Sequence, residues 1–226
     1  EVPPQGLLPW RYHRKKPYIY KDIEISKLIE AAGDLESKDG LRALTYTTLF
    51  GLIATTGMRI SEPLALDRED VDLTKGVLTV RWTKFNKSRL IPIHASTTEK
   101  LKLYNTMRDQ VWKDSQSSSF FVSHKGGRLI DTTVRWTFVK LSHEIGLREP
   151  DDKHGPRLHD LRHTFAVKTL LRWYRAGANV ECRIPELATY LGHVHVSDTY
   201  WYISAIPELL QEATKRLDAV PGGLFS

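Results

Sequence analysis

The 226-residue chain contains little sulfur: one cysteine, Cys182, and two methionines. A single cysteine excludes an internal disulfide and a multi-cysteine zinc site, and this is typical of a protein from a reducing compartment. The sequence also lacks an apolar run of about 18 residues and a signal peptide at its start, the patterns of membrane-spanning and exported proteins. These absences predict a cytoplasmic protein that has no membrane partner.

Acidic residues are fewer than basic ones: 27 Asp and Glu against 33 Lys and Arg give a formal charge of +6. A basic chain favours polyanionic partners, because phosphates neutralised by lysine and arginine release their counterions. Charge alone does not decide the matter, since a solvated basic face without a ligand fits the same balance. The hydrophobic content of 41% is enough for one well-filled globular core.

Apolar residues recur at helical spacing through most of the chain. Helices are predicted over the ranges 22–32, 41–56, 96–111, 131–146, 158–176, 183–191, 196–203 and 206–218. A further helix can begin at Ser61, a good capping residue. The period changes to two between Val77 and Ile93, around a polar turn at 85–88, which indicates an antiparallel hairpin. The predicted fold is therefore mainly α with a small antiparallel β-sheet, an α+β fold.

The first 21 residues differ in composition from the rest of the chain. Pro3, Pro4 and Pro17 oppose helix formation, and basic residues are interleaved with aromatic ones. This composition suits an extended arm that lies along a phosphate backbone, and equally an aromatic arm packed on its own domain. We therefore expect a basic extended arm or linker at 1–21 and one domain at 22–226.

The segment 157–163 carries the most unusual group of polar side chains. His159 and Arg162 are three residues apart, so on a helix they share a face and can converge on one anion. His159 and His163, four apart, could instead hold a metal ion, although a zinc site would need a third protein ligand. Arg162 would also place a positive charge beside that ion. A purely structural pair of side chains is the remaining interpretation.

Two other segments place polar residues beside a glycine. Arg59 follows Gly57 at a helix-to-helix junction, where a surface ion pair to Glu62 is the simplest interpretation. Further on, the turn containing His193 precedes a tyrosine-rich helix, a pattern that by itself usually has a structural role. Tyr202 is one of nine tyrosines, and nothing in its immediate surroundings distinguishes it.

Taken in order, these segments resemble the tyrosine recombinase, or phage integrase, family. The stretch 56–62 is similar to the family's first arginine box, 159–166 to its His-x-x-Arg box, and 191–202 to its final histidine and tyrosine box. The nine-residue step from His193 to Tyr202 is the spacing that the family uses. The hairpin at 83–92 resembles its lysine-bearing turn, although Phe85 stands where many members have glycine. Four ordered boxes are far more specific than any one of them.

The resemblance implies a catalytic domain at 22–226 that breaks and rejoins double-stranded DNA without a metal or other cofactor. A tyrosine attacks a phosphodiester to give a 3′-phosphotyrosyl link and a free 5′ hydroxyl, and a second 5′ hydroxyl reverses the step. Two guanidiniums suit the charge that builds on the phosphoryl oxygens. The catalytic residues implied are Arg59, Lys84, His159, Arg162, His193 and Tyr202.

The family also implies a role for each of these residues. The two arginines stabilise the transition state, and His159 accepts the proton of Tyr202, whose unperturbed pKa is about 10. Lys84 protonates the departing 5′ oxygen from the minor-groove side, and His193 hydrogen-bonds a phosphate oxygen.

Neighbouring residues are expected to have other roles. Tyr200, two residues before the nucleophile, would point elsewhere on a helix and is interpreted as a packing residue. Lys87 is the alternative general acid in the lysine-bearing turn. His163 is expected to buttress the fold, and Glu62 to orient Arg59 or the start of its helix.

DNA contacts are expected beyond the catalytic residues. The helix predicted at 131–145 and the basic turn before it either enter the major groove, which the family favours, or form the solvated face of an amphipathic helix. The expected DNA-binding residues are Lys87, Arg89, Lys125, Arg128, Arg135 and Lys140.

The family also bears on assembly. The helix predicted at 206–218 either docks into a neighbouring protomer, so that dimers or tetramers form on DNA, or packs on its own domain. Nothing in the sequence resembles the amino-terminal DNA-clamping domain that family members usually carry. The segment 1–21 is therefore expected to be the linker from that domain.

The expected function is that of a site-specific recombinase, integrase or transposase of a mobile element. A type IB topoisomerase would use the same chemistry to relax supercoils without exchanging DNA partners. A DNA-binding module that lacks activity and a metal hydrolase built on His159 and His163 belong to other classes and remain as alternatives.

Overall fold

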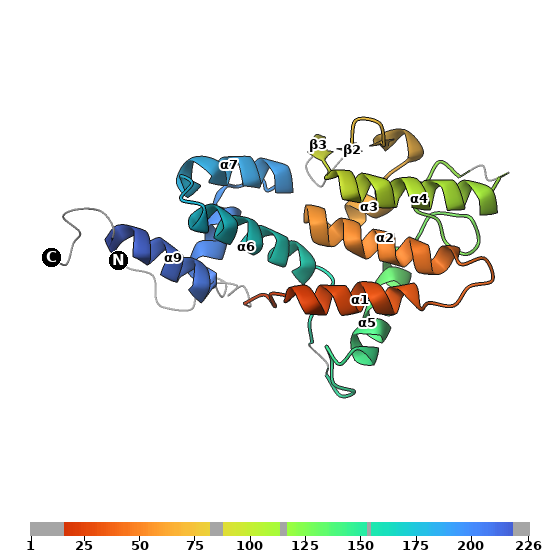
Figure 1. The fold of residues 1–226 in the computed structure, drawn as a ribbon, viewed down its shortest axis with the longest axis horizontal. Helices are drawn as coiled ribbons and strands as arrows, with labels where there is room; N and C mark the ends of the chain where they lie inside the picture. The colour runs from red at the N-terminus through yellow and green to blue at the C-terminus, as the bar shows by residue number, and fades with distance from the viewer. Residues whose placement is uncertain (1–15, 82–87, 114–116, 153–154, 219–226) are drawn as a thin grey trace, which may run out of the picture.

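The computed structural model describes residues 16–81, 88–113, 117–152 and 155–218. Most of these residues are helical, and the strands form one small sheet (Figure 1). This arrangement confirms the predicted α+β fold. The helices are α1 (Asp22–Gly33), α2 (Leu41–Thr56), α3 (Ser61–Ala65), α4 (Ala95–Val111), α5 (Asp131–Glu144), α6 (Asp160–Arg175), α7 (Val180–Leu191), α8 (Ser197–Ala205) and α9 (Pro207–Asp218), with a 3-10 turn at Arg68–Asp70.

The sheet has the strand order β1-β2-β3, and both pairs are antiparallel. Strands β2 (Val77–Val80) and β3 (Arg89–Pro92) form the predicted hairpin, in which Leu78 pairs with Ile91. Strand β1 (Val71–Asp72) has two residues, too few to show an alternating pattern in the sequence. The predicted hairpin turn falls mostly outside the described residues.

Helix ends follow local chemistry that is visible in the sequence. Helix α2 ends at Gly57, whose φ of 64° lies in the left-handed region that glycine adopts without steric cost. Helix α7 begins after Asn179, whose side chain accepts a hydrogen bond from the backbone of Cys182, and ends at Gly192 with a φ of 68°. These two glycine ends are important because the carbonyls beside them hold the arginines of the site.

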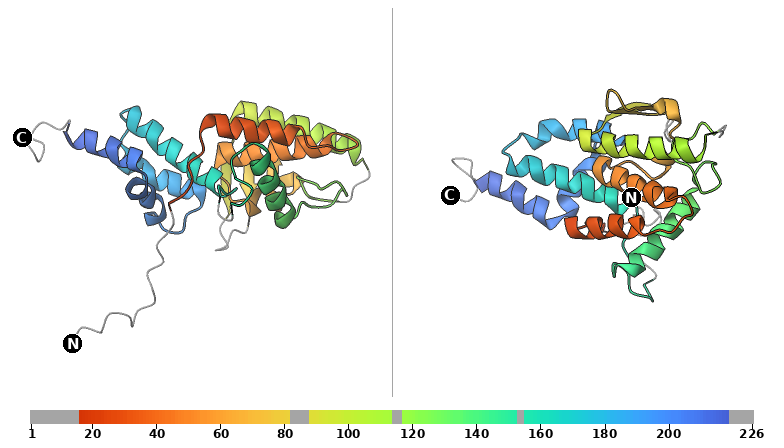
Figure 2. Two further views of the ribbon diagram at one scale, coloured as in Figure 1. Left: turned by 90° about the horizontal axis from the view of Figure 1, so that it is seen from below. Right: turned by 45° about the vertical axis from the view of Figure 1, so that its right-hand side comes forward.

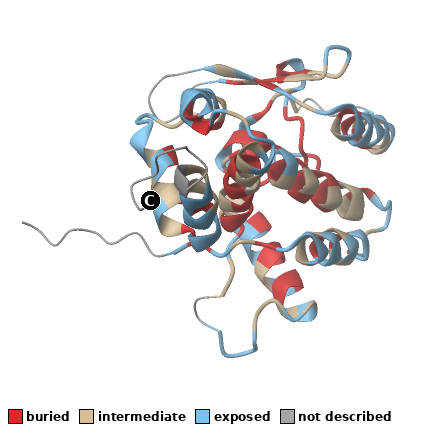
Figure 3. Ribbon diagram, turned by 60° about the vertical axis from the view of Figure 1, so that its left-hand side comes forward, coloured by how far each residue is buried: buried red, intermediate tan, exposed pale blue. Residues whose placement is uncertain are grey.

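Two hydrophobic cores lie side by side. The larger one joins the sheet to α1, α2, α4 and α5, and the smaller one is formed by α6, α7, α8 and α9 (Figures 1 and 2). Helix α6 belongs to both, since Leu161 at its start is buried in the larger core and Val167 and Leu170 in the smaller. Buried residues face the spaces between the helices, while exposed residues cover the outer sides (Figure 3).

The end of the predicted arm and helix α9 both pack on their own domain. The backbone N–H of Tyr20 donates to Oγ1 of Thr164 at 2.9 Å, and its ring is buried. Helix α9 packs on α6 and α8, with Leu209 buried and the Arg216 guanidinium 4.8 Å from the centre of the Tyr174 ring. Residues 1–15, which hold most of the predicted arm, lie outside the described residues. None of the described helices has the length and apolarity needed to cross a membrane.

Candidate active site

Arg162 is one of the most deeply buried charged side chains of the described structure, at 2% exposure. Its Nη1 donates to the carbonyl of Gly57 at 2.8 Å and its Nη2 to that of Leu191 at 2.7 Å. Burial, reinforced by the charge of Arg59, lowers its pKa to about 10, so the guanidinium stays protonated at neutral pH. Helix ends of both cores therefore fix this positive charge in place.

Arg59 lies beside it and is more accessible, with 36% of its side chain exposed. Its Nη2 donates to the carbonyl of Gly192 at 3.0 Å, and its Nη1 lies 3.4 Å from the Leu191 carbonyl oxygen that Arg162 also uses. The carboxyl end of a helix carries partial negative charge and so favours cations. The end of α7 thus brings both guanidiniums together, and Arg59 is the one that faces solvent.

Glu62 connects the arginines to the sheet. Its carboxylate accepts two hydrogen bonds from Arg89, at 3.0 and 2.8 Å, and one from Nη1 of Arg59 at 3.2 Å. Burial raises the pKa of Glu62, but the hydrogen bonds and charge of Arg89 outweigh it and hold the pKa below its usual range. The expectation that Glu62 orients Arg59 agrees with this geometry.

Arg89, which the sequence suggests as a DNA contact, has partners within the domain. Its side chain is 11% exposed and turned inward, with Nε donating to the Tyr190 carbonyl at 2.8 Å in addition to the paired bonds to Glu62. A guanidinium used in this way has little surface left for a DNA phosphate. Arg89 therefore holds the Glu62 carboxylate that in turn accepts a hydrogen bond from Arg59. The sequence could not show this, because Glu62 is 27 residues away from Arg89.

Tyr202 is buried in α8, at 2% exposure. Its hydroxyl oxygen lies 2.8 Å from Nδ1 of His163, and the two ring centres are 5.6 Å apart. The ring of Trp201 packs against it as well, at 5.3 Å between centres. Nothing in the sequence connects His163 with the tyrosine beyond its place next to Arg162, so only the structure shows this contact.

The other two histidines lie against the same pair. The ring of His159 meets that of His163 edge-on, with centres 4.8 Å apart, and burial, followed by the charges of His163 and Arg162, lowers the pKa of His159 to about 4. His193 places Nδ1 2.7 Å from Oγ1 of Thr199, and its ring lies parallel to that of Tyr202 at 6.5 Å. Lys84 and Lys87 lie outside the described residues.

The cluster is thus built from both cores. Arg59 comes from the junction after α2, Arg162 and the two histidines from the start of α6, and His193 and Tyr202 from the end of α7 and from α8. Within the residues that the structure describes, no grouping of three His, Cys, Asp or Glu side chains could hold a metal ion, so the third ligand of the metal-hydrolase alternative is not provided there. Two guanidiniums, three imidazoles and a phenol in one place suit an anionic substrate and a nucleophilic hydroxyl.

Residues 20–208 match the family model described as the phage integrase family. The chain belongs to the phage integrase family. This membership confirms the resemblance read from the four boxes, and the family consists of tyrosine recombinases, enzymes that transfer DNA strands.

Curated relatives of this phage integrase family protein are named as an integrase/recombinase or as tyrosine recombinases. It is 47% identical over 222 residues to "Putative integrase/recombinase y4rB" of Sinorhizobium fredii, covering 96% of this chain and 71% of the relative. It is 32% identical over 193 residues to tyrosine recombinase XerD of Staphylococcus epidermidis, covering 85% of this chain and 59% of the relative. The chain thus spans between about three fifths and seven tenths of the length of these relatives.

Solved structures of the family share its fold. The XerA recombinase superposes with a TM-score of 0.68 at 24% identity, over 94% of this chain and 68% of that one. XerH bound to a palindromic difH substrate in a post-cleavage complex gives a TM-score of 0.66 at 24% identity, over 90% and 54% of the two chains.

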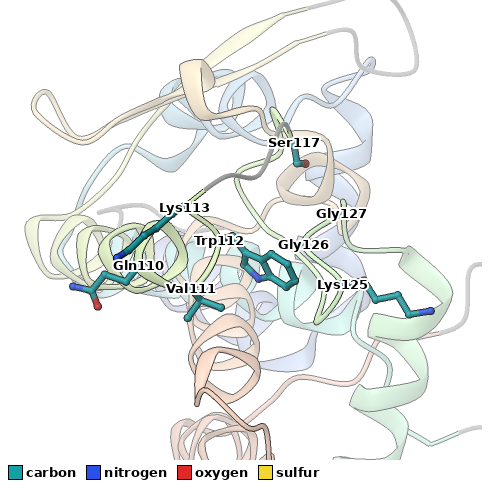
Figure 4. Close-up of a pocket in the computed structure, with 8 residues that line it drawn as sticks. All are labelled: Gln110, Val111, Trp112, Lys113, Ser117, Lys125, Gly126 and Gly127. Atoms are coloured by element: carbon teal, nitrogen blue, oxygen red, sulfur yellow. The ribbon is translucent and has the colours of Figure 1, made fainter.

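The remaining predicted DNA contacts of this phage integrase family chain lie on the larger core. Arg135 and Lys140 are exposed on α5, each paired within the helix, to Asp131 at 2.8 Å and to Glu144 at 3.5 Å. Lys125 belongs to the turn before α5, and its side chain points away from Trp112 (Figure 4). The next residue, Gly126, lies close to the Trp112 ring. Part of the Arg128 guanidinium is hydrogen-bonded within the domain, since its Nη1 donates to the Leu64 carbonyl at 2.8 Å.

Proposed function

We propose that this chain is the catalytic part of a site-specific DNA recombinase or integrase of a mobile element, with Tyr202 as the nucleophile. The observation that carries the proposal is the contact of the Tyr202 hydroxyl with the helix that also bears Arg162, within a single chain. The names of the relatives, which include an integrase/recombinase and tyrosine recombinases, support the same conclusion.

The geometry suits phosphoryl transfer. As the phenol oxygen bonds to phosphorus, negative charge builds on the non-bridging oxygens, and fixed guanidiniums stabilise it without reorganising. Arg162 is held rigidly by two carbonyls, whereas Arg59 is more exposed and can reach the phosphate. His193 supplies a further hydrogen bond to a phosphate oxygen, and Lys84 protonates the departing 5′ oxygen. The product is a 3′-phosphotyrosyl link and a 5′ hydroxyl.

Double-stranded DNA is the proposed partner, and assembly of several copies on it is part of the proposal. Among proteins of this fold, XerH was solved with difH DNA and a lambda integrase tetramer with a Holliday junction. Arg135, Lys140, Lys125 and Arg128 are the proposed backbone contacts outside the catalytic cluster. The proposed location of the protein is the cytoplasm, where its DNA lies.

The test uses a pool of nicked suicide duplexes whose sequence is randomised around the nick. Wild-type protein is expected to form a covalent DNA adduct in the presence of EDTA, and Tyr202→Phe to form none. Tyr200→Phe is the matched control, because Tyr200 lies on the same helix with 45% exposure, and it should form the adduct normally.

Three results would contradict the assignment. An adduct that persists in Tyr202→Phe would exclude this nucleophile, and an absolute metal requirement would favour a hydrolase. Relaxation of supercoiled DNA without exchange between two sites would favour a type IB topoisomerase.

A further inference from the structure

His163 is a titratable side chain of the cluster that has no part in the reaction proposed above. His163 places Nδ1 2.8 Å from the Tyr202 hydroxyl oxygen, within the range of a good hydrogen bond to a hydroxyl. A neutral imidazole that carries its proton on Nε2 has a lone pair on Nδ1, and a phenol can donate to it. In that tautomer, the phenolic proton lies between Tyr202 and His163.

We propose that His163 is the immediate acceptor of the Tyr202 proton. This assignment rests on the proposed function and moves the role of base from His159 to the next turn of α6. As the Tyr202 oxygen bonds to phosphorus, its proton passes to Nδ1 of His163. The bond from phosphorus to the 5′ oxygen breaks, and that oxygen takes a proton from the general acid, for which Lys84 is the candidate. On rejoining, the imidazolium returns its proton to the tyrosine oxygen.

His159 is poorly suited to the same task. Its burial lowers its pKa to about 4, which makes it a weak acceptor for the proton of a phenol. Its ring instead meets the ring of His163 edge-on at 4.8 Å and so helps to fix the plane of that imidazole. His159 is therefore better placed to orient its neighbour and to donate a hydrogen bond to a phosphate oxygen.

The groups around His163 link proton transfer to DNA binding. Arg162 and His159 lie on its own helix, Tyr202 faces it from α8, and His193 follows α7 beside the tyrosine ring. Without DNA, the fixed charge of Arg162 opposes a second positive charge on His163. A bound phosphate adds negative charge and favours the imidazolium. Transfer of the tyrosine proton to His163 is thus favoured when the phosphate of the substrate is present.

The test separates proton acceptance from hydrogen bonding. In His163→Asn, the side-chain oxygen can stand near the position of Nδ1 and accept a hydrogen bond, but it cannot take the proton; His163→Phe can do neither. His159→Asn is the comparison within the site. His94→Asn is the remote control, since His94 caps α4 and asparagine is an equally good cap. Adduct formation is measured in a single turnover from pH 5.5 to 9.5, on a duplex recovered from the randomised pool.

Wild-type protein and His94→Asn should slow towards acid pH, where the imidazolium cannot accept a proton. Both His163 variants should bind DNA as tightly as wild type and melt cooperatively, yet react about 100-fold more slowly. Their rates should rise tenfold per pH unit with no plateau at alkaline pH, because hydroxide then removes the proton. In a third variant, His163→Ala, which leaves space for a small base, added imidazole should partly restore adduct formation. His159→Asn should be slower than wild type while keeping the wild-type pH profile.

Two results would overturn the assignment. Adduct formation by His163→Asn at half the wild-type rate or more would reduce His163 to a hydrogen-bond acceptor. A rate that rises tenfold per pH unit without a plateau in His159→Asn, together with a wild-type pH profile in His163→Asn, would return the role of base to His159. Failure of the wild-type chain to form any adduct would instead refute the proposed function itself, and this proposal with it.

Discussion

The arginine side and the tyrosine side of the site are held by different kinds of contact. Arg59 and Arg162 donate to main-chain carbonyls at the ends of α2 and α7, which can move only if the helices move. Tyr202 and His163 meet through their side chains, whose χ angles can change without movement of a helix backbone. The difference indicates a rigid receptor for the phosphate beside a nucleophile that can adjust when DNA arrives.

Removing a rigid anchor should have the largest effect. In Arg162→Lys, a single ammonium cannot bond two carbonyls and a phosphate at once, so the adduct rate should fall at least about 1,000-fold. Urea unfolding should show a loss of about 3 kcal/mol, because buried carbonyls lose their donors. Arg135→Lys on exposed α5 is the control. Near-normal cleavage by Arg162→Lys would show that carbonyl anchoring is unimportant.

Breaking the support beneath the arginines should have the next largest effect. Glu62→Gln leaves Arg89, 11% exposed, without its carboxylate, and loss of one partner from a buried pair costs about 3 kcal/mol. Arg59 also loses an acceptor, so the adduct rate should fall about 100-fold at saturating DNA. In the double variant with Arg89→Met, stability should partly return while cleavage stays low. Full recovery of cleavage in the double variant would contradict a role in placing Arg59.

The contact between the two cores can be probed at Gly57. An added Cβ would lie 2.6 Å from the Phe165 ring, and the φ of 64° is costly for alanine. Gly57→Ala should lose about 2 kcal/mol of stability. It should also cleave about 10-fold more slowly, because the carbonyl that holds Arg162 shifts. Gly51→Ala, which meets no atom within 4 Å, is the matched control.

Protonation of His159 should contribute to the pH dependence of stability. The pKa of His159 is lowered from 6.5 to about 4 in the folded chain, so between these values the unfolded chain binds more protons. Stability should therefore fall as the pH drops from about 6.5 to about 4. His159→Gln should flatten this slope in urea titrations, whereas an unchanged slope would show that His159 is not buried as a neutral ring.

Residues far from both sides should have the smallest effect. Arg135→Ala together with Lys140→Ala should weaken DNA binding by a few fold and lower the slope of log affinity against log salt by about 2. The adduct rate at saturating DNA should not change. A salt slope equal to that of wild type would exclude α5 from the DNA interface.

Much of the fold could be predicted from the sequence, because long periodic segments and glycine ends are local signals. The predicted range 41–56 coincides with α2, and Gly57 ends it as expected. The short strand β1 had no such signal. Within the site, the order of the boxes indicated the members of the cluster. The inward turn of Arg89 and the partner of Tyr202 depend on how elements distant in the sequence pack. The contacting residues are 27 and 39 positions apart, so these contacts could not be predicted.

Helix α6 places Arg162 and His163 at consecutive positions where the two cores meet. Consecutive residues on a helix differ by about 100° in direction and about 1.5 Å in height. Any rotation of α6 about its axis therefore turns both side chains by the same angle and in the same sense. Helix rotation cannot change the direction of the Arg162 guanidinium without changing that of the His163 ring. The orientation of the arginine towards a phosphate and that of the histidine towards Tyr202 are therefore coupled.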